Sequence, residues 1–124
     1  MKFASVRLVT SDIERLVRFY QGLSGIEAVR LADGFAEIRF VSSTLAISSE
    51  DLIKLFNVGA ATAAANQSAI LEFEVEDVDV VFERMKASGT TIVMPTTLMP
   101  WGNRSLLMRD PDGNLVNIFS RPER

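Results

Sequence analysis

The sequence predicts an α+β fold built from two βαβββ modules. Three observations favour it: a short segment recurs along the chain, each copy leads into a helical pattern, and three strand-like segments follow each helix. Segments 6–13 and 71–78 align, with apolar residues at matching positions and an aspartate near the end of each. We expect the two modules to pair edge to edge, giving a curved, mostly antiparallel eight-stranded sheet around a cleft.

Each copy of the repeat continues into a segment with the period of an amphipathic helix. The apolar positions are Ile13, Leu16, Val17 and Tyr20 in the first copy, and Val78, Val81, Phe82 and Met85 in the second. Ser11 followed by Glu14 predicts a capping box at the first helix, and Asp77 is the expected N-cap of the second. Gly25 and Gly89 are expected to end the two helices.

The segments after the helices predict three strands in each module. They span 26–30, 34–41 and 44–48 in the first module, and 91–94, 103–109 and 114–119 in the second. At 124 residues, one domain is the default. We expect a single domain over 1–124, with module 1 at 1–48, a linker with a short helix at 49–68, and module 2 at 69–124.

The composition excludes several classes of function. A net charge of −3 and a pI near 4.9 argue against a general nucleic-acid or membrane surface. The chain contains no cysteine and no histidine, which removes thiolate and imidazole chemistry and leaves only oxygen ligands for a metal. The amino terminus shows no apolar segment of the secretory type, and no apolar run approaches about 20 residues, so we expect a cytoplasmic protein.

Two segments carry a family resemblance. "LVTSDIERLVRFYQGLSGIE" and "PWGNRSLLMRDPDGNLVNIF", together with the internal repeat, resemble the vicinal oxygen chelate superfamily, also called the glyoxalase, bleomycin resistance and dioxygenase group. The resemblance covers nearly the whole chain. It implies paired βαβββ modules, a small-molecule ligand and a homodimer, because a partner commonly covers the exposed sheet edges in such proteins.

The resemblance also indicates where a metal site would be. Metal-binding members place a histidine seven residues before the aspartate that opens each helix, at the positions of Ser5 and Ile70, and a carboxylate on the last strand, where this chain has Asn117. We take Ile47 as the counterpart of Asn117 in the first module. Two hydrocarbons and two neutral oxygens lack the charge that holds a divalent cation, so we expect no metal and no cofactor.

Strand alternation predicts which side chains line the inner face of the sheet. The residues expected to bind a ligand are Arg7, Phe35, Glu37, Arg39, Glu72, Trp101, Arg104 and Asn117. The charged residues can equally form arginine–carboxylate pairs on a solvated face that has no function. Trp101 either plugs the end of the sheet or stacks on a flat ligand, and Arg104 points either to the cleft or to solvent.

The sequence therefore favours a metal-independent small-molecule-binding protein. The resemblance to metal-free bleomycin resistance proteins implies sequestration of an antibiotic or another organic ligand. The alternative is a metal-independent lyase or isomerase that uses Glu72 or Glu37 as a general base. A third possibility is a structural or regulatory dimer whose cleft has no function.

Overall fold

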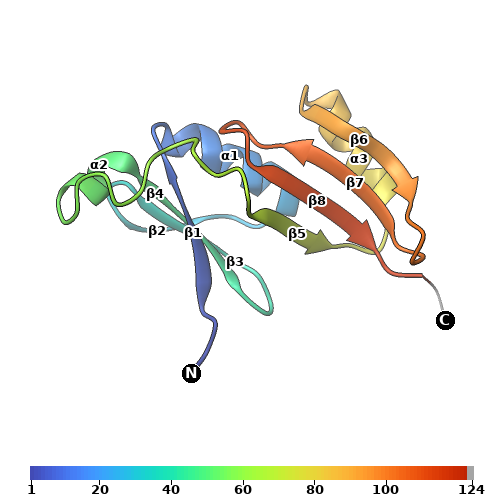
Figure 1. The fold of residues 1–124 in the computed structure, drawn as a ribbon, viewed down its shortest axis with the longest axis horizontal. Coiled ribbons are helices and arrows are strands. Elements are labelled where there is room, and N and C mark those ends of the chain that lie inside the picture. The colour runs from blue at the N-terminus through green and yellow to red at the C-terminus, as the bar shows by residue number, and fades with distance from the viewer. Residues whose placement is uncertain (123–124) are drawn as a thin grey trace. The chain divides into compact units, whose positions relative to one another are not determined.

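The computed structural model describes residues 1–122, which form two compact units, Met1–Ala65 and a second that begins at Asn66. Each unit holds one βαβββ module with its own four-stranded sheet, so the predicted duplication is confirmed (Figure 1). The structure defines each module by itself, and the cleft around a joint sheet stays a prediction. Within the described range, no helix is long and apolar enough to cross a membrane.

The first module contains the four strands and the one helix of the repeat, followed by the short helix of the linker. They are β1 (Ser5–Thr10), α1 (Ile13–Ser24), β2 (Val29–Ala32), β3 (Phe35–Arg39), β4 (Thr44–Ser49) and α2 (Glu50–Lys54). The strand order in the sheet is β1-β4-β3-β2. The pair β1–β4 is parallel, and the other two pairs are antiparallel.

The second module repeats this arrangement. Its elements are β5 (Ile70–Glu74), α3 (Val78–Ala87), β6 (Thr91–Leu98), β7 (Arg104–Arg109) and β8 (Leu115–Ser120), with strand order β5-β8-β7-β6. The pair β5–β8 is parallel and the others are antiparallel, as in the first sheet. The last strand of each module therefore pairs with the first, which closes each module into one mixed sheet.

The helix ends follow the capping chemistry that the sequence predicts, with one correction. The N-cap of α1 is Asp12, whose carboxylate accepts the backbone N–H of Arg15, so the predicted cap at Ser11 is wrong by one residue. Asp77 caps α3 as expected. Gly25 ends α1 in the left-handed region, at φ +72°, and its N–H donates to the carbonyl of Gln21.

Two predicted strand boundaries are wrong by three residues or more. The strand placed at 26–30 begins only at Val29, because the N–H of Ala28 donates to the side chain of Gln21 on α1 and not to a neighbouring strand. The strand placed at 91–94 continues past Pro95 to Leu98, with a register irregularity near the proline. An edge strand tolerates proline there, because that residue's missing N–H need not face a partner.

Each sheet buries one face against its helix. In the first module the buried residues are Leu8, Ala36, Ile38, Leu45 and Ile47 on the strands, and Leu16, Val17, Tyr20 and Leu23 on α1. In the second they are Leu106, Met108, Val116 and Ile118 on the strands, and Val78, Val81 and Met85 on α3. The strand residues between them point to the opposite face, as the period of two requires.

A buried polar network holds the turn between β7 and β8. Asp110 and Asn114 are each 4% exposed. One oxygen of Asp110 accepts the backbone N–H groups of Asp112 and Asn114, and the other accepts the Asn114 side-chain amide at 2.8 Å. The Asn114 side-chain oxygen accepts the amide of Asn66 at 3.0 Å, and Asn66 also bonds the backbone of Ala69. The turn therefore anchors the chain just before β5.

Replacing Asn114 tests the contribution of this network. Asn114→Ala removes a donor from the buried Asp110 carboxylate and an acceptor from Asn66, so we expect a loss of roughly 1–3 kcal/mol in the free energy of unfolding. Urea denaturation measures it. Asn57→Ala is the control, because Asn57 is exposed in the linker. Equal stability of the two variants would contradict the role assigned to the turn.

Candidate functional site

The face of the first sheet opposite α1, here called the first open face, carries four of the predicted ligand-binding residues. Arg7 on β1 is paired in register with Ala46 on β4, and Ala46 with Glu37 on β3. Phe35 and Arg39 are two residues before and after Glu37, so they share its face. The predicted grouping of Arg7, Phe35, Glu37 and Arg39 on one face is therefore what the structure shows.

The first open face carries one ion pair and one further cation that contacts an aromatic ring. Arg39 forms an ion pair with Glu37, with its Nη2 2.9 Å and its Nε 3.0 Å from the same carboxylate oxygen. The guanidinium carbon of Arg7 lies 5.5 Å from the centroid of the Phe35 ring, a cation–π contact. Within residues 1–122, no hydrogen bond or ion pair holds Arg7. The first open face therefore carries two guanidinium groups, those of Arg7 and Arg39, and one carboxylate, that of Glu37.

The face of the second sheet opposite α3, here called the second open face, brings Glu72 and Asn117 together. The two residues are paired in register on β5 and β8, and the Asn117 amide nitrogen donates to a Glu72 oxygen at 2.8 Å. The side-chain oxygen of Asn117 is buried without a partner among the described residues. On the same face, Arg121 lies 5.5 Å from the Phe119 ring centroid and 3.3 Å from Glu74.

Two predicted ligand-binding residues, Trp101 and Arg104, lie outside the groups of contacts on the two open faces. Trp101 lies in the turn between β6 and β7 and is 69% exposed, so the reading of Trp101 as a plug at the end of the sheet is wrong. Arg104 is on the helix side of its sheet, where its guanidinium binds both carboxylate oxygens of Asp79 on α3 at 2.9 and 3.0 Å. Arg104 alternates in phase with Leu106, which faces the helix, and it therefore does not line the open face.

The position assigned to Ile47 also needs correction. Ile47 is fully buried on the helix side of the first sheet, in register with Leu8 and Ala36. Asn117 is the third residue of β8, and the third residue of β4 is Ala46, which faces the open side. A shift of one residue along a strand inverts the face, which is why the sequence alignment missed Ala46.

The side chains at the family's ligand positions do not fit a divalent cation. With the correction, these positions hold Ser5, Ala46, Ile70 and Asn117. One hydroxyl and one amide provide no negative charge to replace the hydration of the ion, and the Asn117 amide nitrogen is directed at Glu72. Over residues 1–122, no group of three or more His, Cys, Asp or Glu side chains could hold a metal ion.

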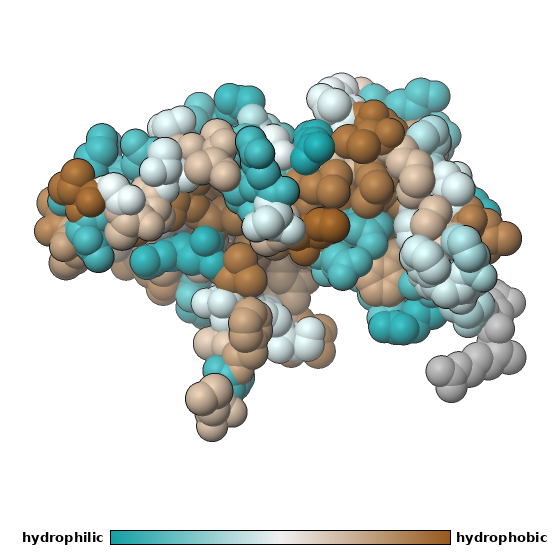
Figure 2. Space-filling view, in the orientation of Figure 1, coloured by the Kyte–Doolittle hydropathy of each residue, from teal (hydrophilic) through white to brown (hydrophobic). Residues whose placement is uncertain are grey.

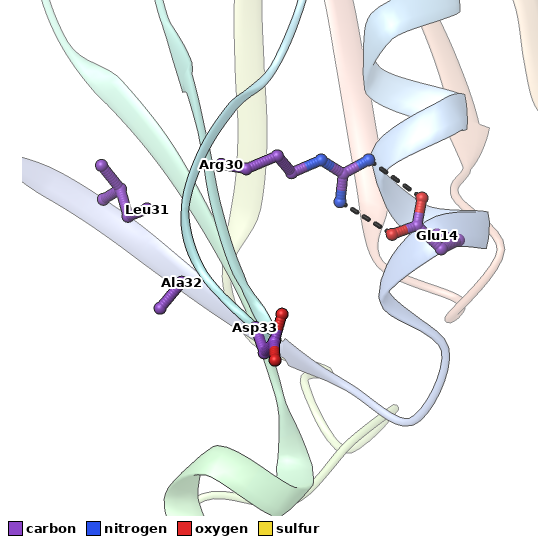
Figure 3. Close-up of a pocket in the computed structure, with 6 residues that line it drawn as sticks. Glu14, Arg30, Leu31, Ala32 and Asp33 are labelled. Carbon is purple, nitrogen blue, oxygen red and sulfur yellow. Dashed lines mark hydrogen bonds and ion pairs between the residues drawn. The ribbon is translucent and has the colours of Figure 1, made fainter.

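Two surface hollows lie in the first module, away from the predicted residues. The larger, of about 550 Å³, is lined by Glu14, Arg30, Leu31, Ala32, Asp33 and Gly34 (Figure 3). There the Arg30 guanidinium binds both oxygens of Glu14 at 2.8 and 2.9 Å. The smaller, of about 310 Å³, is lined by Gln21, Gly25, Ile26 and Glu27. The larger hollow lies between the first turn of α1 and the β2–β3 turn, and the smaller lies where the end of α1 meets the segment that follows it. No sequence motif indicates either hollow.

The fold and the family comparison agree. The sequence model of the glyoxalase/bleomycin resistance protein/dioxygenase superfamily matches residues 2–118, and the chain belongs to this superfamily. It is 26% identical to the uncharacterized protein YraH of Bacillus subtilis (strain 168), over 96% of this chain and 98% of that protein.

Crystal structures with the same fold come from proteins of low sequence identity. A glyoxalase/bleomycin resistance protein/dioxygenase from Nocardioides is 24% identical, with a TM-score of 0.80 over 99% of this chain and 85% of that one. A family enzyme from Burkholderia phytofirmans PsJN is 20% identical, with a TM-score of 0.85 over 97% and 98% of the two chains. At this identity, the similarity defines the fold alone.

The donor set at the family's ligand positions leads to a prediction about metal content. Elemental analysis of freshly purified protein should find far less than one divalent ion per chain, because no carboxylate or imidazole occupies those positions. Added nickel or zinc should leave the melting temperature unchanged. Stoichiometric zinc, iron or nickel that survives dialysis would contradict this assignment.

Proposed function

We propose that the chain is a metal-independent small-molecule-binding protein that holds an organic ligand against the open faces of its sheets. The observation that carries this proposal is repeated in both modules. On each open face a guanidinium group lies 5.5 Å from the centroid of a phenyl ring, Arg7 over Phe35 and Arg121 over Phe119. A flat apolar ring beside a polar group that can donate hydrogen bonds suits binding of a flat organic molecule.

The polar groups around these rings are already held in place. Arg39 fixes Glu37, and Asn117 fixes Glu72. Groups that are ordered before a ligand arrives lose little conformational entropy on binding. The competing interpretation treats the pairs as ordinary surface contacts, which contribute about 0–1 kcal/mol and imply no function. Substitution of the rings separates the two interpretations, since only the first requires the rings for binding.

Sequestration of an antibiotic is the more specific form of the proposal. It is supported by membership of a superfamily that includes bleomycin resistance proteins and by the exposed Trp101, a third flat ring available for stacking. A homodimer belongs to the same proposal. It is supported by exposed apolar side chains at the end of α2 and the start of the linker, Leu55, Phe56 and Val58, in a part of the surface where Figure 2 shows hydrophobic groups.

Leucine substitutions at the two rings test the proposed function. We expect a screen of flat aromatic drugs, read by Trp101 fluorescence and thermal shift, to find compounds that bind at stoichiometric levels. Phe35→Leu or Phe119→Leu keeps an apolar side chain but removes the flat ring, so the dissociation constant should rise roughly three- to tenfold. Isothermal titration calorimetry measures this change.

The matched control for these variants is Phe82→Leu. Phe82 is on α3, on the side of its sheet opposite the open face, and Lys86 lies 5.7 Å from its ring centroid. The control variant should bind the same compounds as the unsubstituted chain does. Unchanged affinity in both ring variants, or a screen in which nothing binds, would refute ligand binding at the open faces.

A lyase or isomerase is the second candidate, and the structure favours one base for it. Glu37 is in an ion pair with Arg39, whereas Glu72 is exposed and accepts a hydrogen bond through only one of its oxygens within the described range. Glu72 is therefore the better placed of the two to take a proton from a substrate.

A turnover assay discriminates the two candidates. For a binding protein, we expect no turnover of a panel of α-hydroxy-ketones and epoxides by the unsubstituted chain. Turnover that Glu72→Gln abolishes and Glu83→Gln leaves intact would replace the binding function with the enzymatic one. Glu83 is a suitable control because it is an exposed glutamate on α3, away from the open face.

A further inference from the structure

We propose that the first open face selects ligands that carry a carboxylate on an aromatic frame, and that Arg7 and Ser48 bind the carboxylate. This inference rests on the proposed function and names the chemical class of its ligand. Three features of the face support it: the position of the Arg7 guanidinium, a buried hydroxyl beneath it that has no partner among the described residues, and an excess of positive charge.

The Arg7 side chain crosses over the strand next to it. Arg7 is on β1 and Phe35 is on β3, with β4 between them. Neighbouring strands are about 4.8 Å apart, so a guanidinium in contact with the Phe35 ring extends over β4. Arg7 is in register with Ala46 and Phe35 with Ser48, which places the guanidinium above these two small residues. Both are buried, as expected for residues under a long side chain.

Ser48 supplies the second polar group. It is fully buried, and its hydroxyl has no hydrogen-bond partner within residues 1–122. An unpaired buried hydroxyl lowers stability, and such groups in folded proteins call for a physical explanation. Within residues 1–122, only the contact with the ring holds Arg7, so its guanidinium is able to rotate away from β4. A ligand oxygen that enters there accepts hydrogen bonds from both Ser48 and Arg7.

The charge of the face favours an anion. The Glu37 carboxylate is paired with Arg39, so among the described residues no carboxylate compensates the Arg7 cation. A carboxylate is planar and offers two oxygens to the fork of a guanidinium group, an arrangement stronger than a neutral hydrogen bond. The Arg7 guanidinium lies over the Phe35 ring, so when it turns toward a ligand carboxylate this face of the ring becomes available for an aromatic frame to stack on.

Three probes that share one aromatic frame test this selectivity. They are naphthoate, naphthylmethylammonium and naphthalenemethanol, titrated calorimetrically into the full chain. We expect naphthoate to bind tightest and its affinity to fall as the salt concentration rises. Arg7→Gln should weaken naphthoate binding roughly 10- to 100-fold and leave the neutral alcohol unaffected. Arg18→Gln, which removes an exposed arginine of α1, should change neither.

Ser48→Ala separates binding from folding. The variant should weaken naphthoate binding several-fold while its melting temperature stays the same or rises, because the hydroxyl removed has no partner in the part of the chain that the structure describes. A merely structural role of Ser48 would give the opposite pattern, with a lower melting temperature and unchanged binding.

The remaining outcomes distinguish this inference from the proposed function. If the cation or the alcohol binds as tightly as naphthoate, or if Arg7→Gln and Arg18→Gln behave alike, carboxylate selection is refuted while ligand binding stands. If none of the three probes binds, both the selectivity and the open-face binding site are refuted.

Discussion

The structure depends on the burial of one face of each sheet against a single helix. In the first module, Tyr20 on α1 and Ile38 and Ile47 on the strands are fully buried, and the second module repeats this with Met108 and Ile118 against α3. Because successive strand residues alternate between faces, the same strands carry charged and aromatic residues on the other side. The packing that stabilises each module thus uses one face of its sheet and leaves charged and aromatic residues on the other.

The two modules have the same fold, but their open faces carry different side chains at corresponding positions. Both contain a cross-strand pair of phenylalanine and serine at corresponding positions, with the two residue types exchanged between the strands. Phe35 on β3 is paired with Ser48 on β4, whereas Ser105 on β7 is paired with Phe119 on β8. The exchange moves the aromatic ring by one strand, so each module presents a different surface.

The sequence predicts the parts of this structure that depend on local patterns, and misses those that depend on register or on pairing between distant segments. The hydrophobic period and the capping residues were sufficient to predict the elements of both modules. The alternation of strand residues was sufficient to place Arg7 on one face with Phe35, and Glu72 on one face with Asn117. The counterpart of Asn117 in the first module was assigned to Ile47 and not to Ala46. A shift of one residue along a strand inverts the face, and the composition does not indicate which of the two neighbouring residues faces the helix. The pairing of Arg104 with Asp79 joins residues 25 positions apart, and no local pattern indicates it.

The chain belongs to the glyoxalase/bleomycin resistance protein/dioxygenase superfamily, and the side chains at the superfamily's ligand positions do not provide the negative charge that holds a divalent cation. The most direct measurement is a crystal structure of the protein as purified from cells. We expect density for an organic molecule stacked on the Phe35 or Phe119 ring. An ion coordinated by the Asn117 oxygen, or open faces covered only by ordered water, would contradict it.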